Sequence, residues 1–324
     1  MPHRETEDFQ DLLARGRKGD KRAIGQMISR IETFGLADGD ITQQLWVHSG
    51  RAIILGVTGA PGAGKSTLTD RMVKHWLTQG RRLGVIAVDP SSPFTGGAIL
   101  GDRVRMSDLA LAENVYIRSM STRGQLGGLS LACSGAVSVL DACGCDLILV
   151  ETVGVGQSEV AIMNVADLVL VISVPGLGDD VQAIKAGVLE IGDIFAVNKS
   201  DLPGADRVAR ELRVMLEMNP NMGAHQPPVH MVSAERNEGV ADLCAAILET
   251  YAWMHESAEL TKRRHRRLRE ELTTYMQNRV YQQALAPLLG SGDFTQRLNE
   301  FLAHKCNPYA WAEEAVWRIT GRNM

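Results

Sequence analysis

The sequence predicts an α/β protein with a mostly parallel, doubly wound sheet that is flanked by helical extensions at both ends. Two observations lead to this prediction: short, continuous apolar runs recur between residues 53 and 232, and helix-compatible stretches separate them. Continuous runs are typical of strands buried on both faces of a parallel sheet. Strands that alternate with helices build repeated βαβ units, with helices on both faces. The predicted strands are 53–57, 83–88, 147–150, 168–172, 194–197 and 229–232.

Helical segments are predicted on both sides of this region. Before residue 51, apolar residues such as Ile24, Met27 and Ile31 recur at helical spacing. After about residue 255 the strand-like runs stop and a segment rich in arginine begins. For this basic segment we expect a solvated helix face or a dimer-forming arm, with contact to an acidic partner or nucleic acid as the alternative. The predicted parts are an N-terminal helical extension over 1–50, an α/β domain over 51–255 and a C-terminal helical dimerisation arm over 256–324.

Composition and charge argue against several classes of protein. The chain has 324 residues, with 34 Lys+Arg against 38 Asp+Glu and a net charge of −4. This slightly negative charge argues against a general nucleic-acid binder, because a phosphate backbone selects for a cationic surface. The acidic segment from Met1 to Asp20 suits neither a transit peptide nor a secretory signal, and no apolar run is long enough to span a membrane. We therefore expect a cytoplasmic protein that binds neither nucleic acid nor membranes.

The five cysteines are an odd number, scattered through the chain, which argues against a disulfide framework. Cys143 and Cys145 are candidates for a metal site, but metal-binding pairs usually have wider spacing with further Cys or His nearby. We expect all five to be reduced, buried and structural.

The strongest motif runs from Gly59 to Ser66, GAPGAGKS, and matches the pattern GxxxxGK[ST] in full. It follows a predicted strand and precedes a helix-like stretch, as the phosphate-binding loop (P-loop) of nucleotide hydrolases does; a glycine-rich turn is the alternative. In such a loop, backbone N–H groups surround the β-phosphate and the helix dipole favours the anion. We expect Lys65 to bridge the β- and γ-phosphates and the Ser66 hydroxyl to bind Mg²⁺. The predicted phosphate-binding residues are Gly59, Ala60, Pro61, Gly62, Ala63, Gly64, Lys65, Ser66 and Thr67.

Three carboxylates are candidates for the magnesium neighbourhood together with Ser66. Glu151 and Asp89 each follow a predicted strand, and Asp102 lies in a glycine-containing loop further on. Mg²⁺ prefers a few protein oxygens plus waters and phosphate oxygens, so not all of them need to bind it directly. For Asp102 the alternative is an ordinary surface acid. Gly154, shortly after Glu151, is expected to sense the γ-phosphate through its N–H.

Two glycine-containing loops have the composition of moving segments, one over 89–105 and one over 175–185. Loops that a γ-phosphate and its Mg²⁺ order, and that hydrolysis releases, are the basis of GTPase switching. The alternative is that these glycines only mark turns.

A second motif, NKSD at residues 198–201, predicts that the base is guanine. An aspartate carboxylate only accepts hydrogen bonds, and guanine offers N1–H and N2–H₂ as adjacent donors, whereas adenine has no donor at N1. Asp201 therefore favours GTP over ATP, and a backbone N–H near Ala234 suits guanine O6. We expect Asn198 to brace the loop and reach the base edge, and Lys199 to lie over the ring. The predicted guanine-binding residues are Asn198, Lys199, Asp201, Ser233, Ala234 and Glu235.

Three longer strings carry a family resemblance: VDPSS at 88–92, GGAILGDRVRM at 96–106 and VETVGVGQSE at 150–159. With them, residues from about 51 to 240 resemble the MeaB/ArgK-type GTPases associated with methylmalonyl-CoA mutase, within the P-loop metallocentre-chaperone GTPases. The resemblance implies a homodimeric GTP-hydrolysing chaperone with GTP/GDP and Mg²⁺ as ligands. It would gate adenosylcobalamin loading from an adenosyltransferase, and protect or reactivate an adenosylcobalamin-dependent acyl-CoA mutase.

By matching position, the resemblance places Ser66, Asp89, Asp102 and Glu151 near Mg²⁺. It puts Asp179 and Lys185 in a third, partner-responsive switch. Lys65, Asp102 and Lys185 are then the expected catalytic residues. Two other classes of function stay open: a P-loop kinase that transfers the γ-phosphate to an acceptor, and a nucleotide-regulated binding protein whose hydrolysis is incidental.

Overall fold

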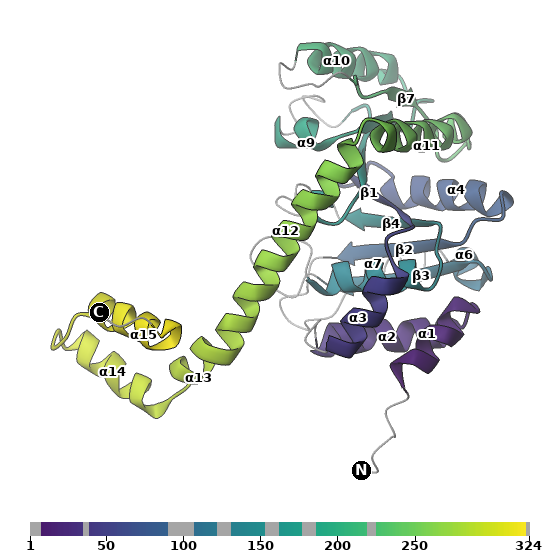
Figure 1. The fold of residues 1–324 in the computed structure, drawn as a ribbon. Coiled ribbons are helices and arrows are strands. Elements are labelled where there is room, and N and C mark those ends of the chain that lie inside the picture. Colours follow the sequence, from purple (N-terminus) through teal and green to yellow (C-terminus); the bar gives the residue numbers. More distant parts are fainter. Residues whose placement is uncertain are drawn as a thin grey trace. The chain divides into compact units, whose positions relative to one another are not determined.

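The computed structural model describes residues 8–34, 39–89, 107–121, 131–152, 162–176, 186–218 and 225–321. The chain divides into two compact units, which meet in the sequence between residues 267 and 268. The first unit contains a parallel sheet with helices on both faces, and the described residues of the second are helices and short turns (Figure 1).

The described part of the first unit holds a seven-stranded sheet in which every pair of neighbouring strands is parallel. The strand order is β3-β2-β4-β1-β5-β6-β7, so β1 lies in the centre, between β4 and β5. The parallel, doubly wound sheet that the sequence predicts is therefore confirmed. The strands are β1 (Ile53–Gly59), β2 (Leu83–Asp89), β3 (Val115–Ser121), β4 (Leu147–Thr152), β5 (Leu168–Ser173), β6 (Ile194–Val197) and β7 (Val229–Met231).

Strand β3 is absent from the predicted strands, and its position in the sheet explains why. It lies at the edge and pairs only with β2, so it is not covered as the central strands are. Tyr116 and Arg118 are only partly buried, while Val115 and Met120 are buried. The apolar run is therefore interrupted, and the criterion of a continuous run misses an edge strand.

Helices cover both faces of the sheet and create two separate cores. On one face, Leu55, Leu149 and Leu170 pack with apolar residues of α4 and α11. On the other, alternate strand residues such as Ile54 and Val169 pack with α1, α2, α7 and α10. The described helices of the first unit are α1 (Phe9–Arg17), α2 (Lys21–Phe34), α3 (Gly39–His48), α4 (Lys65–Thr78), α6 (Ser107–Leu111), α7 (Leu131–Ala142), η2 (Ile162–Asn164), α9 (Ala186–Ile191), α10 (Ala205–Met218), α11 (Val240–Glu256) and the beginning of α12 (Glu259–Val280).

The N-terminal helices share a core with the sheet. Leu12, Met27 and Ile31 are buried in the same cluster as Ile54 and Leu140. Burial of such side chains stabilises the fold by about 1.5–3 kcal/mol each. The helices predicted before residue 51 are therefore confirmed, and they form one of the layers over the sheet.

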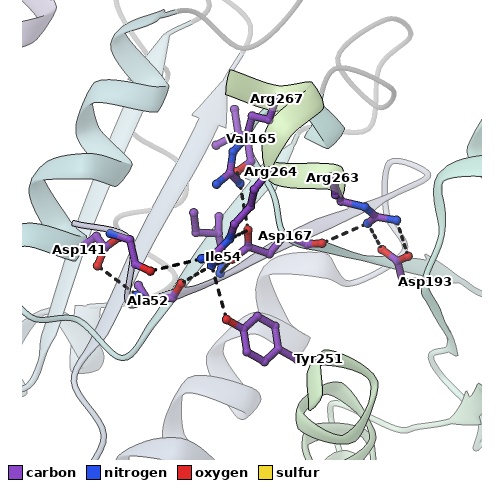
Figure 2. A network of polar contacts seen from close by, with 11 residues as sticks. Ala52, Ile54, Asp141, Val165, Asp167, Asp193, Tyr251, Arg263, Arg264 and Arg267 are labelled. Atoms are coloured by element: carbon purple, nitrogen blue, oxygen red, sulfur yellow. Dashed lines mark hydrogen bonds and ion pairs between the residues drawn. The ribbon is translucent and has the colours of Figure 1, made fainter. Parts of the chain in front are cut away.

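Three arginines of α12 that belong to the first unit, Arg263, Arg264 and Arg267, pair with acids of that unit rather than being solvated. Arg264 donates to the Asp167 carboxylate through Nε at 2.9 Å and Nη2 at 2.7 Å, and Arg267 Nη1 donates to it at 3.1 Å. Arg263 makes a two-pronged contact with Asp193, at 2.6 and 2.9 Å (Figure 2). Asp167 is fully buried. A solvated face is thus wrong for these three arginines; we call them, with Asp167 and Asp193, the arginine clamp.

The second unit has little buried surface of its own. No described residue from 268 to 321 is buried. Trp311 contacts Phe294 and Phe301, with ring centroids 5.2 and 5.9 Å apart. Its helices after α12 are η3 (Tyr281–Leu285), α13 (Ala286–Leu289), α14 (Gly292–Leu302) and α15 (Pro308–Thr320).

Four of the five cysteines are buried free thiols, as predicted; for Cys306 the prediction of burial is wrong, because it is only partly buried. Burial raises the pKa of Cys143 and of Cys145 to about 12. Within the described ranges, no group of three or more His, Cys, Asp and Glu side chains is placed to hold a metal ion. None of the described helices combines the length and apolarity that a membrane span requires.

Candidate nucleotide-binding site

The P-loop connects the end of β1 with the beginning of α4. Gly59, Gly62 and Gly64 have φ values of 142°, 77° and 82°, which side-chain-bearing residues rarely adopt. A Cβ atom at Gly59 would collide with the Ile172 carbonyl oxygen, and one at Gly64 would lie 2.5 Å from Asn198 Nδ2. Close packing and backbone conformation therefore both require glycine at positions 59 and 64, and backbone conformation alone favours it at Gly62.

The N-terminus of α4 is open to an anion, and a buried lysine lies beside it. Gly64 is the N-cap and carries no side chain to cap the helix. Lys65 is 7% exposed, and its Nζ donates to the carbonyls of Gly59 at 2.9 Å and Ala60 at 3.1 Å. The ammonium group is thus held over the loop. Helix N–H groups and a fixed cation together suit a phosphate.

Ser66 and Glu151 come together from α4 and β4. Val57 of β1 is the register partner of Glu151 on β4. This pairing brings the buried Glu151 carboxylate to the loop, where it accepts a hydrogen bond from Ser66 Oγ at 2.6 Å. A hydroxyl and a carboxylate are oxygen donors of the kind that Mg²⁺ prefers, with waters and phosphate oxygens completing its shell. The donor set therefore fits Mg²⁺.

Several predicted residues lie outside the described part of the chain. They include Asp102, Gly154, Asp179 and Lys185, with most of the two predicted moving loops. For Asp89 only the backbone is described, at the last position of β2, the strand beside β4.

The guanine motif is attached to the P-loop through two side chains. Asn198 is 2% exposed; its Nδ2 donates to Ala63 O at 2.9 Å, and its Oδ1 accepts from Ala234 N at 3.0 Å. Lys199 has φ 56°, and its Nζ donates to Gly62 O at 3.0 Å. Asn198 thus acts as the brace that the motif predicts, and in this structure it takes the Ala234 N–H that we expect near guanine O6.

Asp201 lies at the mouth of this arrangement. Ser233 Oγ donates to its Oδ1 at 2.7 Å, and Arg236 Nη2 lies 3.6 Å from its Oδ2. The hydrogen bond from Ser233 lowers the pKa of Asp201 below its ordinary value of 3.8. The backbone N–H of Asp201 itself and the charge of Arg236 lower it further. The carboxylate therefore stays ionised and able to accept hydrogen bonds at neutral pH.

Two arginines at the site are missed by sequence reasoning. Arg71 of α4 donates to the carbonyls of Ala234 at 2.9 Å and Glu235 at 3.3 Å. Arg236 is the partner of Asp201 described above. Backbone carbonyls leave no trace in a sequence, so the role of Arg71 had no signal. Arg236 directly follows Glu235, one of the predicted guanine-binding residues. This position was a weak indication that Arg236 lies at the site.

Comparison with known proteins identifies the family. The family model described as "Methylmalonyl Co-A mutase-associated GTPase MeaB" matches residues 21–287. The chain belongs to this family. The GTPase ArgK of Escherichia coli is 33% identical over 301 residues, covering 90% of this chain and 89% of that protein. A Pyrococcus abyssi protein named as a GTPase is 42% identical over 317 residues, covering 97% of this chain and 98% of its own.

The solved structures agree on the fold. A crystal structure of a LAO/AO transport system kinase superposes with a TM-score of 0.71 at 24% identity, and covers 96% of this chain and 97% of that one. At this identity the similarity shows the fold alone. The family and the named relatives show that this MeaB-family protein is a GTPase, which binds GTP and GDP and hydrolyses GTP to GDP and phosphate.

Proposed function

We propose that this GTPase is the nucleotide-driven chaperone of an adenosylcobalamin-dependent acyl-CoA mutase of the methylmalonyl-CoA mutase type. It would gate cofactor loading from an adenosyltransferase, and protect or reactivate the mutase. The family description supports the link to the mutase. The observation that carries the switch itself is Asn198, whose amide joins the P-loop to the guanine loop, residues 233–238. A base-reading loop and a phosphate loop that are fastened together respond to the nucleotide as one site.

For the phosphates, we assign binding to Gly59 through Thr67. Lys65 is positioned by two carbonyls and would move to the β- and γ-phosphates when a nucleotide is present. Ser66 and Glu151 would hold Mg²⁺, with Asp89 and Asp102 as further members of its neighbourhood. The ion supplies positive charge that offsets the charge of the phosphate oxygens.

For the base, we assign selection to Asp201, supported by Asn198, Lys199 and Ser233. The ionised carboxylate would accept from guanine N1–H and N2–H₂. Ser233 orients the carboxylate through its hydroxyl, which leaves lone pairs on both carboxylate oxygens for the base. Adenine would leave this acceptor unpaired at N1, which would disfavour ADP and ATP.

For hydrolysis, we assign catalysis to Lys65, Asp102 and Lys185, with water attacking the γ-phosphate in line. Lys185 would supply a second cation once the mutase is bound, as an arginine finger does. Such a contribution raises the rate by about 10³–10⁵.

We also propose that the second unit joins two copies of the chain in a homodimer. Ten of its large apolar side chains are exposed, and none of its described residues is buried. Burying them against an identical copy would supply the core that the unit lacks. The exposed apolar residues are Leu272, Met276, Val280, Tyr281, Leu289, Leu298, Leu302, Tyr309, Val316 and Ile319.

The test is GTP turnover with and without a purified acyl-CoA mutase. We expect the mutase to raise kcat, and we expect Lys185→Ala to lose this increase while GDP affinity is kept. Lys74→Ala, an exposed lysine on α4, is the matched control and should respond to the mutase as the wild type does. Equal turnover with and without mutase would remove the chaperone role and leave the GTPase. Stimulation that persists in Lys185→Ala would favour incidental hydrolysis, and label transfer to an acceptor other than water would favour a kinase.

A further inference from the structure

Arg71, in the second turn of α4, connects the P-loop helix to the guanine loop. Its Nε donates to Ala234 O at 2.9 Å and its Nη2 donates to Glu235 O at 3.3 Å. A guanidinium is a rigid, planar fork, so it fixes both carbonyls at once in a way that a flexible ammonium does not.

The two carbonyls determine the direction of one backbone donor. The Ala234 N–H donates to Asn198 Oδ1, and the Arg236 N–H donates to Ser233 Oγ at 3.4 Å. The Glu235 N–H has no acceptor among the described residues. It shares a trans peptide with the Ala234 carbonyl, so the two groups point in opposite directions. By holding the carbonyl toward α4, Arg71 turns the N–H away from α4.

We propose that Arg71 is a positioning residue for guanine selection, which holds the Glu235 N–H as the donor for guanine O6. This inference rests on the proposed guanine site. Guanine carries an acceptor at the 6-position where adenine carries an amino donor, so a fixed N–H donates to guanine O6 and opposes the adenine amino group. Arg71 would then select the 6-position as Asp201 selects positions 1 and 2.

The test compares the dissociation constants of GDP, IDP and ADP for the full-length chain by calorimetry. Arg71→Met keeps the apolar stem and removes the donors. We expect GDP and IDP to bind about tenfold more weakly, and by the same factor, because inosine keeps O6. The ADP affinity should not fall, because the fixed N–H opposes the adenine amino group. Arg71→Lys, which can hold one carbonyl, should lie between the variant and the wild type.

Two further variants separate positioning from general damage. Lys74→Met, on the same helix and paired only with the nearby Asp70 at the surface, should leave all three affinities unchanged. Asp201→Asn should change the GDP to IDP ratio, because it loses the contact to N2, whereas Arg71→Met should not.

The outcomes are distinct. The positioning role is overturned if the GDP dissociation constant of Arg71→Met lies within twofold of the wild-type value. It is also overturned if the variant's affinity for ADP falls as much as its affinity for GDP. If the wild type itself binds ADP as tightly as GDP, the proposed guanine site is overturned, and this role with it.

Discussion

Replacing Asp167 by asparagine should destabilise the first unit more than an ordinary carboxylate substitution does, because Asp167 is the centre of the arginine clamp. Its carboxylate is fully buried, and it accepts from Arg264 twice, from Arg267 once and from the Ile54 N–H at 3.3 Å (Figure 2). The hydrogen bonds to Asp167 also raise the pKa of Arg264. Asparagine keeps the shape but removes the charge and turns one acceptor into a donor.

The magnitude follows from these contacts. One oxygen of Asp167 accepts from Arg264 and Arg267, and the other accepts from Arg264 and Ile54. The amide oxygen of asparagine can replace only one of these oxygens, so the two hydrogen bonds to the other oxygen are lost. The less costly loss is the pair Arg264 and Ile54: one hydrogen bond to a charged donor at about 1.5–3 kcal/mol and one to a neutral donor at about 0.5–1.5 kcal/mol amount to about 2–4.5 kcal/mol. Breaking one partner of a buried ion pair costs about 3–5 kcal/mol by an independent route. We therefore expect about 3–5 kcal/mol, a large part of a total stability of about 5–15 kcal/mol.

Urea unfolding followed by circular dichroism measures this. With a slope of about 3 kcal/mol per molar, the midpoint should fall by about 1–1.7 M. Glu217→Gln, an exposed carboxylate on α10, is the matched control and should stay within about 0.5 kcal/mol of the wild type. Arg264→Met combined with Asp167→Asn should cost less than the sum of the two changes. A midpoint within about 0.3 M of the wild type, or strict additivity, would refute the clamp.

Two further predictions concern the base and the thiols. Asp201→Asn should lower GDP affinity about a hundredfold and favour xanthosine diphosphate, whose C2 carbonyl accepts from the new amide. Titration with both nucleotides measures this preference. A preference for GDP that is the same as in the wild type contradicts the prediction. In the folded chain, iodoacetamide should modify Cys306 at least about a hundredfold faster than the buried thiols, because burial raises the pKa of those thiols to about 12. Peptide mass spectrometry measures the labelling, with the urea-unfolded chain as the control. Labelling of Cys143 as fast as that of Cys306 contradicts the prediction.

Sequence reasoning can predict a site where the function needs particular atoms at a fixed spacing. A phosphate needs N–H groups, and a P-loop needs glycine at positions where a Cβ would collide, as at Gly59. Guanine needs an acceptor such as Asp201, which needs an orienting group such as Ser233. The central strands were predicted because burial on both faces imposes one kind of residue, and that constraint is absent at the edge strand β3.

It failed where one side of the interaction is backbone or a single acid far away in the chain. Arg71 binds two carbonyls, and carbonyls occur at every residue. The arginines of α12 look solvated in the sequence because their partners, Asp167 and Asp193, are isolated acids 97 and 70 positions from Arg264 and Arg263. Charge density alone therefore does not distinguish a solvated helix face from a docked one.

The position of those acids contains a signal that can be used in advance. Asp146, Asp167 and Asp193 each directly precede a strand, and each accepts from a backbone N–H at or beside the start of a neighbouring strand: Arg82 at 2.7 Å, Ile54 at 3.3 Å and Val169 at 2.7 Å. An acid just before a buried strand therefore satisfies backbone donors at the amino edge of the sheet.

The two edges of the sheet thus differ in where their anions come from. At the carboxyl edge, the N-terminus of α4 and Lys65 can bind an anion from outside the chain. At the amino edge, the chain supplies its own anions, the fully buried Asp167 and the partly buried Asp193, and pairs them with arginines of α12. Buried carboxylates of this kind need cations that remain charged, and arginine meets that need better than lysine. Arg263, Arg264 and Arg267 of α12 are therefore explained by the two acids with which they pair at the amino edge of the sheet.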